Sequence, residues 1–135
     1  MEIIPNLHFS GECEKAIDLY ERALGAKRTV LLTYKDANPM DWQPSSDKDG
    51  ELVYHAELMI GDQRIMLNDH TSDIPCGTNV SLLVLFDSVQ EASRAYAVPK
   101  EGAQILAPNT ETTYSSFFAS LIDRYGVRWE LMKEN

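Results

Sequence analysis

The chain has 135 residues, of which 44% are hydrophobic and 24% are charged, an ordinary composition for one globular domain that needs no disulfide or metal to fold. Its formal net charge of −9 argues against nucleic-acid binding, which requires a basic face. The sequence contains no apolar run of the ~20 residues that a membrane span needs, and its first residues do not resemble a signal peptide. We therefore expect a cytoplasmic protein with no membrane and no nucleic-acid partner.

The first half of the chain reads as a strand, a helix and three further strands. Residues 3–9 form a short strand-like run, and apolar residues then recur at helical spacing over residues 13–24. Gly25 stands where a C-terminal cap of that helix is expected. Strands are predicted over three later segments: 27–35, 52–60 and 64–69.

The segment of residues 36–50 shows neither the apolar spacing of a helix nor the alternation of a strand. It contains two prolines, four aspartates and Trp42, so it is predicted to be a loop. Trp42 is a large aromatic residue where no strand requires one. Three interpretations stay open: Trp42 closes over a ligand as a lid, packs against a partner subunit, or belongs to a partly ordered loop around Pro39 and Pro44.

The second half of the chain repeats the order of the first half. Residues 80–86 are strand-like, and Ser88 with Glu91 forms a capping box at the start of a helix that ends before Pro99. Three strands are predicted after it: 103–107, 114–122 and 127–133.

Matching residues support an internal repeat. Ala16 with Ala92 and Tyr20 with Tyr96 are both 76 positions apart, and the segment that starts at Arg64 matches the one that starts at Arg128, 64 positions later. Ala56 and Leu58 likewise match Ala119 and Leu121. The sequence therefore predicts an α+β fold with two βαβββ modules, about 1–75 and 76–135, that form a single domain.

Several short motifs, whose order is more specific than any one of them, are spread along nearly the whole chain. They are Phe9-Ser-Gly11, residues 14–20 and 24–26, His55-Ala-Glu-Leu58, residues 60–61, Met66-Leu-Asn-Asp69 and residues 123–129. With them the sequence resembles the PhnB-like branch of the glyoxalase, bleomycin-resistance and extradiol-dioxygenase proteins, the vicinal oxygen chelate superfamily. The resemblance implies that each module curls into a half-barrel, that the two form a ligand cavity, and that the chain is a homodimer. The branch is also described as demethylubiquinone methyltransferases, but no glycine-rich turn after a strand supports a nucleotide cofactor here.

Metal-dependent members of the superfamily place ligands on the first and last strands of each module. The resemblance puts four residues at these positions: Pro5, Met66, Ser81 and Glu130. Because proline, methionine and serine are poor ligands for a hard or borderline ion, we expect no glyoxalase-type metal centre and no other cofactor. A divalent metal is the alternative.

Three residues are candidates for catalysis. Glu130 lies between Trp129 and Leu131, so strand alternation points it away from the helix-packed face. It is either a general base or metal ligand, or a carboxylate paired with Arg128 or Arg64. His55 and Glu57 share one face of a strand, where they suit acid–base chemistry or metal binding, although such a face is often simply solvated.

The remaining polar candidates have weaker signals. Tyr114 is expected, with Trp42, to line the cavity. His8 is expected to point away from the position of Pro5 as a packing residue. His70 is expected to lie exposed at a strand end, with orientation by Asp69 as the alternative. Both cysteines, Cys13 and Cys76, are expected to be ordinary packing or surface residues.

Two functions from different classes follow. The first is binding of a small molecule in the cavity without a glyoxalase-type metal. The alternative is a metal-assisted or acid–base lyase or isomerase. The fold hosts many chemistries, so the sequence leaves open which of the two applies and which ligand is bound.

Overall fold

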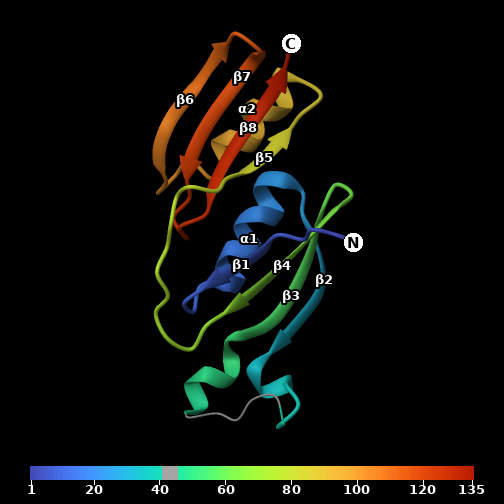
Figure 1. Cartoon of the computed structure of the whole chain (residues 1–135), viewed down its shortest axis with the longest axis vertical. Coiled ribbons are helices and arrows are strands. Elements are labelled where there is room, and N and C mark those ends of the chain that lie inside the picture. The colour runs from blue at the N-terminus through green and yellow to red at the C-terminus, as the bar shows by residue number, and fades with distance from the viewer. Residues whose placement is uncertain (41–45) are drawn as a thin grey trace. The chain divides into compact units, whose positions relative to one another are not determined.

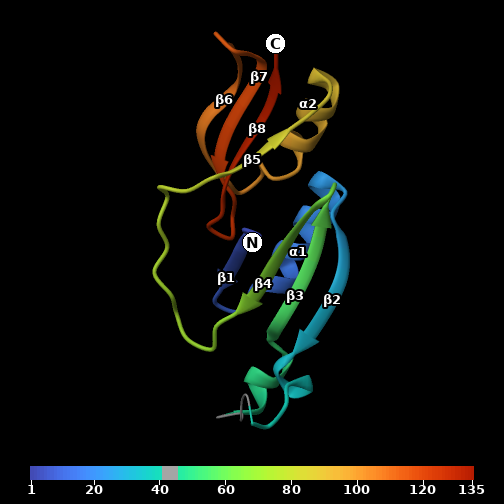
Figure 2. The same ribbon diagram turned by 45° about the vertical axis from the view of Figure 1, so that its right-hand side comes forward.

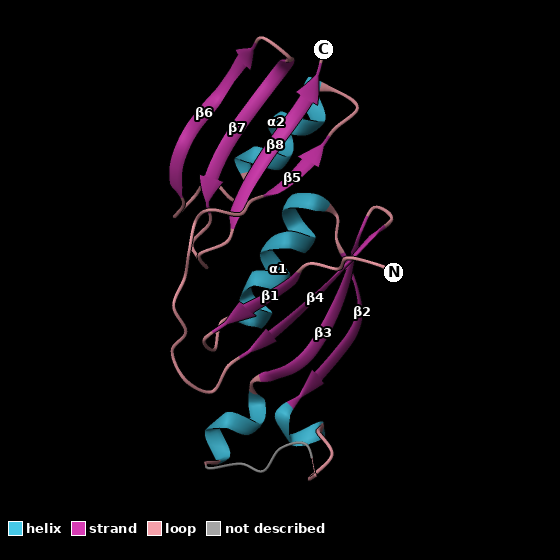
Figure 3. Ribbon diagram, viewed as in Figure 1, coloured by secondary structure: helices cyan, strands magenta, loops and turns pink. Residues whose placement is uncertain are grey.

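The chain forms two βαβββ units, Met1–Pro75 and Cys76–Asn135, in the computed structural model, which describes residues 1–40 and 46–135 (Figure 1). Among the described residues, each unit contains one α-helix and one four-stranded sheet (Figure 3). The predicted α+β fold with tandem modules is confirmed. None of the helices in the described part of the chain is long and apolar enough to span a membrane.

The first unit has the sheet order β1-β4-β3-β2, in which only β1 and β4 run parallel. Its elements are β1 (Asn6–Phe9), α1 (Cys13–Leu24), β2 (Lys27–Thr33), β3 (Val53–Ile60) and β4 (Gln63–Asp69). The helix ends as predicted, because Gly25 adopts the left-handed conformation with φ 64°.

The strand predicted over 27–35 ends at Thr33, and a short 3-10 helix, Tyr34–Asp36, leads from it into the segment predicted to be a loop. A second 3-10 helix, Asp47–Glu51, lies at the other end of that segment. The Asp36 carboxylate accepts hydrogen bonds from the backbone N–H (3.0 Å) and the hydroxyl (2.8 Å) of Thr33, which closes the first of these turns. A single turn of this kind leaves no periodic pattern in the sequence. Trp42 lies outside the described residues.

The second unit repeats the arrangement with the order β5-β8-β7-β6, and β5 runs parallel to β8. Its elements are β5 (Leu82–Leu85), α2 (Val89–Ala97), β6 (Gln104–Thr112), β7 (Ser115–Ile122) and β8 (Arg128–Glu134). Strand β6 continues beyond the predicted end at residue 107. It is an edge strand with three register shifts against β7, and such a strand tolerates Pro108.

Each helix covers one face of its own sheet and forms the core with it (Figure 2). In the first unit, Ile17 and Tyr20 of α1 are buried together with Leu58 and Leu67 of the sheet. In the second unit, Ala119, Leu121, Trp129 and Leu131 alternate along β7 and β8 as core residues. The opposite face of each sheet is therefore free to carry polar residues, although Ser120 and Met132, on that face of the second sheet, are also buried.

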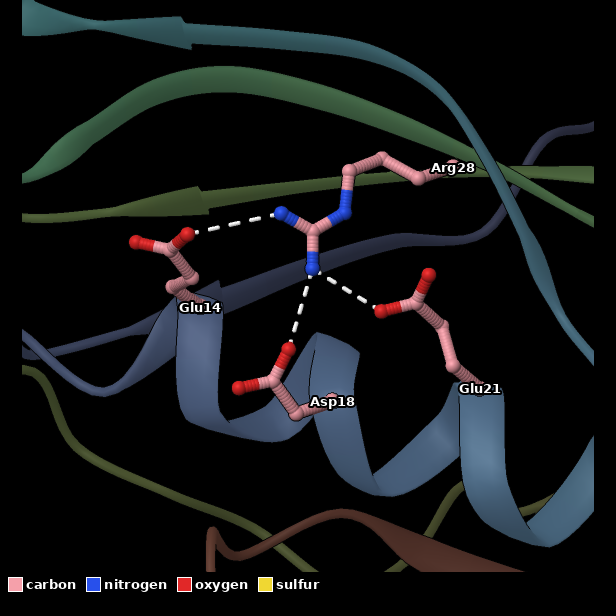
Figure 4. Close-up of polar contacts among 4 residues, drawn as sticks. All are labelled: Glu14, Asp18, Glu21 and Arg28. Atoms are coloured by element: carbon pink, nitrogen blue, oxygen red, sulfur yellow. Dashed lines mark hydrogen bonds and ion pairs between the residues drawn. The ribbon is translucent and has the colours of Figure 1, made fainter.

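Arg28 connects β2 to α1 through three carboxylates (Figure 4). Its Nη2 lies 2.8 Å from Glu21 Oε1 and 3.0 Å from Asp18 Oδ1, and its Nη1 lies 3.4 Å from Glu14 Oε1. The hydrogen bond to Glu21, together with the nearby acidic charge, raises the pKa of Arg28. Because the cluster is partly exposed, we expect it to contribute little to the free energy of unfolding.

A buried carboxylate joins three segments of the first unit. Asp69 is 2% exposed, and its Oδ1 accepts hydrogen bonds from the backbone N–H groups of Gly11 (2.8 Å) and Cys13 (3.0 Å). Its Oδ2 accepts one from Val53 N–H at 3.0 Å. The end of β4 thus holds the start of α1 and the start of β3 in place.

A second buried carboxylate closes the β7–β8 turn of the second unit. Asp123 is 3% exposed, and its Oδ1 accepts from the N–H groups of Tyr125 (2.8 Å) and Val127 (3.1 Å). Its Oδ2 accepts from Trp129 Nε1 at 3.0 Å. The sequence did not indicate that Asp69 and Asp123 are buried and join separate segments. Aspartate is common in turns, and its burial depends on the tertiary structure.

Candidate functional site

The face of the first sheet opposite α1 carries a short chain of charged side chains. Glu57 sits between the buried residues Ala56 and Leu58 and pairs across the strands with Met66. Glu57 Oε1 lies 3.2 Å from His55 Nε2 and 3.7 Å from Arg64 Nη1. The Glu57 side chain is only 18% exposed, so its charge is held by these two neighbours rather than by water.

The arrangement suits proton transfer. A carboxylate in contact with an imidazole fixes the ring and selects its tautomer, and this is how a histidine is prepared to act as a general base. The structure therefore places His55 and Glu57 on one face and in contact, as strand alternation indicated. Arg64 was considered only as a partner of Glu130, and here it contacts Glu57.

The equivalent face of the second sheet carries a different cluster. Glu130 on β8 pairs across the strands with Ser120 on β7, and Glu130 Oε1 lies 3.3 Å from Arg128 Nη2. Arg128 Nη1 donates to the carbonyl of Thr78 at 2.9 Å. The pairing of Glu130 with Arg128 matches one of the two partners that the sequence suggested.

Two buried polar atoms in this second cluster have no hydrogen-bond partner among the described residues, Ser120 Oγ and Arg128 Nε. Ser120 is 3% exposed. A buried donor without an acceptor costs about 1–3 kcal/mol, so such atoms concentrate where a ligand or an ordered water supplies the acceptor. The sequence did not indicate Ser120, because a serine on a strand is unremarkable until its burial is known.

The internal repeat shows how the two clusters are related. Arg64 and Arg128 occupy equivalent positions, and so do Glu57 and Ser120, and Met66 and Glu130. The carboxylate is therefore on β3 in the first unit, whereas in the second unit it is on β8, the strand that is equivalent to β4. In both units the arginine at this position contacts a strand carboxylate, Glu57 in the first unit and Glu130 in the second.

The positions of metal ligands in related proteins were predicted to fall on Pro5, Met66, Ser81 and Glu130. The register corrects two of these positions. Asn6, not Pro5, pairs with Met66, because β1 begins at Asn6 and Pro5 instead accepts the Met66 N–H through its carbonyl at 2.9 Å. Leu83, not Ser81, pairs with Glu130.

These pairs do not fit a divalent ion. The first offers an amide and a thioether, and the second offers an aliphatic side chain and a carboxylate that already contacts Arg128. Within the described ranges 1–40 and 46–135, no three His, Cys, Asp or Glu side chains are grouped closely enough to hold a metal ion.

His70 lies at a strand end as expected, but His8 is exposed and not a packing residue. His8 pairs with Asn68 in the register, so it lies on the polar face with Asn6. His70 follows β4, and its Nε2 lies 3.1 Å from His8 Nδ1. The Asp69 carboxylate does not orient His70, because it accepts backbone hydrogen bonds on the core side.

The other candidates lie apart from these clusters. Tyr114 is 59% exposed in the β6–β7 turn, where its carbonyl accepts the N–H of Asn135 at 3.2 Å. Cys13 is fully buried, and this burial, reinforced by Asp69 and Glu14, raises the pKa of its thiol far above the usual range. Cys76 is exposed. Cys13 is therefore an inert packing residue.

Comparison with known proteins identifies the relatives of the chain. Residues 1–132 match the model of the family described as 3-demethylubiquinone-9 3-methyltransferase. Protein YjdN of Escherichia coli strain K12 is 26% identical over 140 residues, which cover 96% of this chain and 92% of YjdN. Protein PA1353 of Pseudomonas aeruginosa is 27% identical, with 99% of this chain and 98% of that one covered and a TM-score of 0.88. Neither of these two names states an activity.

Two further solved structures show the same fold. The PhnB protein from Bacillus cereus is 24% identical, covers 98% of this chain and 99% of its own, and has a TM-score of 0.81. A glyoxylase/bleomycin resistance protein/dioxygenase domain from a Frankia species is 14% identical, with 100% and 98% covered and a TM-score of 0.67. The match to the family model confirms the resemblance to PhnB-like proteins, and the two solved structures show that the chain shares the glyoxalase and bleomycin-resistance fold.

Proposed function

We propose that this chain, which belongs to the 3-demethylubiquinone-9 3-methyltransferase family of PhnB-like proteins, binds a small molecule without a glyoxalase-type metal centre. The binding surface in this proposal is the face of the second sheet that carries Ser120, Arg128 and Glu130. The methyltransferase description belongs to the family and does not enter the proposal. The donor set supports the part about the metal, because Met66 and Leu83 stand where ligands would be needed.

The observation that carries the proposal is the pair of unpartnered buried atoms. Ser120 Oγ and Arg128 Nε lack partners among the described residues, and both belong to the face that carries Glu130. Other donors of the same arginine are used, since Nη1 bonds to the carbonyl of Thr78 and Nη2 to Glu130. The remaining Nε–H and the hydroxyl are the groups that an incoming acceptor would satisfy.

These groups define the chemistry of the ligand. Arg128 neutralises Glu130, so the cluster has little net charge and favours a polar molecule over a bare ion. An acceptor oxygen of the ligand would take the Ser120 and Arg128 donors, and a donor of the ligand would contact the free lone pairs of Glu130. Tyr114 lies apart from this cluster and Trp42 lies outside the described residues, so the contact of either with a ligand stays a prediction from the sequence.

The test is a ligand screen on untagged protein, by thermal shift and ligand-observed NMR, with a panel of small carboxylic acids, hydroxy acids and amides. For any hit, Ser120→Ala should raise Kd by about tenfold, since one net hydrogen bond contributes ~1–1.5 kcal/mol. Glu134→Gln is the control, because this acid is exposed at the end of the neighbouring strand β8 and should leave Kd unchanged. Equal effects of the two substitutions on every hit would contradict the proposal.

Acid–base catalysis is the second candidate, and one contact favours it. His55 Nε2 and Glu57 Oε1 are 3.2 Å apart on a face where the acid is half-buried. If the chain is a lyase or isomerase, Glu57→Gln or Glu130→Gln should abolish turnover of a bound hit and leave its Kd within about threefold. Binding without turnover in the unsubstituted protein would leave simple binding as the function.

Assembly and location are part of the same proposal. The family resemblance supports a homodimer in the cytoplasm. Light scattering after size-exclusion chromatography should give twice the mass of the 15.2 kDa chain. A mass of 15.2 kDa at micromolar concentration would refute the dimer.

A further inference from the structure

We propose that His8 and His70 form a chelating site for one borderline divalent ion, with Ni²⁺ or Zn²⁺ as the expected type. The site lies at the end of β1 and β4 in the first unit and does not include His55, Glu57 or Glu130. It is independent of the proposed small-molecule function. No described acid or thiol joins the two rings to make a third protein ligand.

The backbone holds the two histidines next to each other. His8 is the third residue of β1, and His70 directly follows β4, the strand that runs parallel to β1. The backbone N–H of His70 donates to the carbonyl of Phe9 at 2.6 Å, so the parallel pairing continues as far as His70. Two residues that are 62 positions apart in the sequence are thus fixed as neighbours.

The distance between the two nitrogens suits a shared ion. His70 Nε2 and His8 Nδ1 are 3.1 Å apart. With metal–nitrogen bonds of about 2.0–2.1 Å, two donors at this separation subtend an angle of roughly 95–100° at a common ion. That angle lies between the octahedral and the tetrahedral value. The ring centroids are 5.0 Å apart and the planes meet at 63°. Because the two nitrogens face each other in this contact, both rings must rotate to direct their lone pairs at one ion.

An ion can replace the hydrogen bond between the two rings. In the hydrogen bond between the rings, one nitrogen donates and the other accepts. When an ion binds, the imidazole that donates in this contact must carry its proton on its other ring nitrogen, so that both coordinating nitrogens offer a lone pair. His8 is exposed, which leaves coordination positions for water, and the chain's net charge of −9 favours the approach of cations.

The composition of the chain provides a sharp test. It contains only three histidines, and His55 is engaged with Glu57. Calorimetric titration of untagged Cys76→Ser protein with Ni²⁺ and with Zn²⁺ should give one ion per chain; this background removes the exposed thiol as a competing ligand. His8→Gln or His70→Gln should weaken binding by about 100-fold, the lower end of the gain from linking two donors. His55→Gln, the matched control, should not change it.

A measurement on the unsubstituted protein covers the case in which a variant does not fold. Substoichiometric Ni²⁺ should broaden the imidazole NMR signals of His8 and His70 and leave those of His55 sharp. Broadening of His55 first, or equal affinity in all three glutamine variants, would overturn the site. The outcome is separate from the proposed function, because Glu130→Gln should retain the ion whether or not it alters ligand binding.

Discussion

Substituting Asp69 with asparagine tests whether the first unit depends on a buried carboxylate. The change preserves the size of the side chain but replaces one acceptor oxygen with a donor. If Oδ1 keeps the N–H groups of Gly11 and Cys13, the new amide group faces the N–H of Val53. Two donors then oppose each other at a site that is 2% exposed.

The magnitude follows from the three hydrogen bonds. Leaving the Val53 N–H unpaired costs about 1–3 kcal/mol. The two retained hydrogen bonds lose their ionic acceptor, at about 1 kcal/mol each, because charge-assisted hydrogen bonds are roughly twice as strong as neutral ones. Burying a neutral amide costs less than burying a carboxylate, which offsets part of this loss. We expect Asp69→Asn to lower the free energy of unfolding of the first unit by about 3 kcal/mol.

Urea unfolding followed by circular dichroism measures the loss, and amide hydrogen exchange locates it. Exchange at Gly11, Cys13 and Val53 should accelerate most. Asp73→Asn is the matched control, because this aspartate is exposed and its substitution should change stability by less than about 0.5 kcal/mol. A loss of under about 1 kcal/mol for Asp69→Asn, or unchanged exchange at the three amides, would refute the reasoning.

Three further outcomes are expected. Arg28→Met should lower the free energy of unfolding by about 1 kcal/mol at low salt and by much less in 1 M NaCl. The reason is that its contacts with Glu14, Asp18 and Glu21 are partly exposed, so salt screens them. An effect that is independent of salt would mean that packing, not charge, is lost. Ellman's reagent should label one thiol per native chain, Cys76, and the buried Cys13 only in denaturant; two fast thiols would show that α1 opens. Because burial raises the pKa of Cys13, the folded chain retains a proton that the unfolded chain releases above pH ~8.5, so stability should fall with rising pH by up to ~1.4 kcal/mol per pH unit. Cys13→Ala should remove that part of the alkaline slope in urea titrations, and an unchanged slope would assign it to other groups.

Local patterns predicted both helices well. The apolar spacing from Cys13 and the glycine at position 25 mark the helix α1 as the structure has it, and the capping box at Ser88 marks α2, where Ser88 Oγ accepts the Glu91 N–H at 3.1 Å. These signals work because a helix is stabilised by hydrogen bonds and caps within a few residues of each other. Strand β6 was predicted too short, since its pairing with β7 is irregular and no alternation survives.

For the candidate site, strand alternation indicated which side chains share a face. It placed His55 with Glu57, and Glu130 opposite the helix-packed residues, because successive strand residues point to opposite sides. Alternation did not indicate which residues of neighbouring strands lie opposite each other. The one-residue correction from Pro5 to Asn6 therefore came only from the parallel register of β1 with β4.

The sequence by itself determined the two modules, their family and the facing of the polar strand residues, since each follows from local spacing or from motifs in order. Only the tertiary structure decided that Asp69 and Asp123 are buried staples, that Ser120 Oγ lacks a partner among the described residues, and that His8 lies 3.1 Å from His70. These properties depend on contacts between residues far apart in the chain and on exclusion of water. A one-dimensional pattern records neither the strand register nor the burial that creates them.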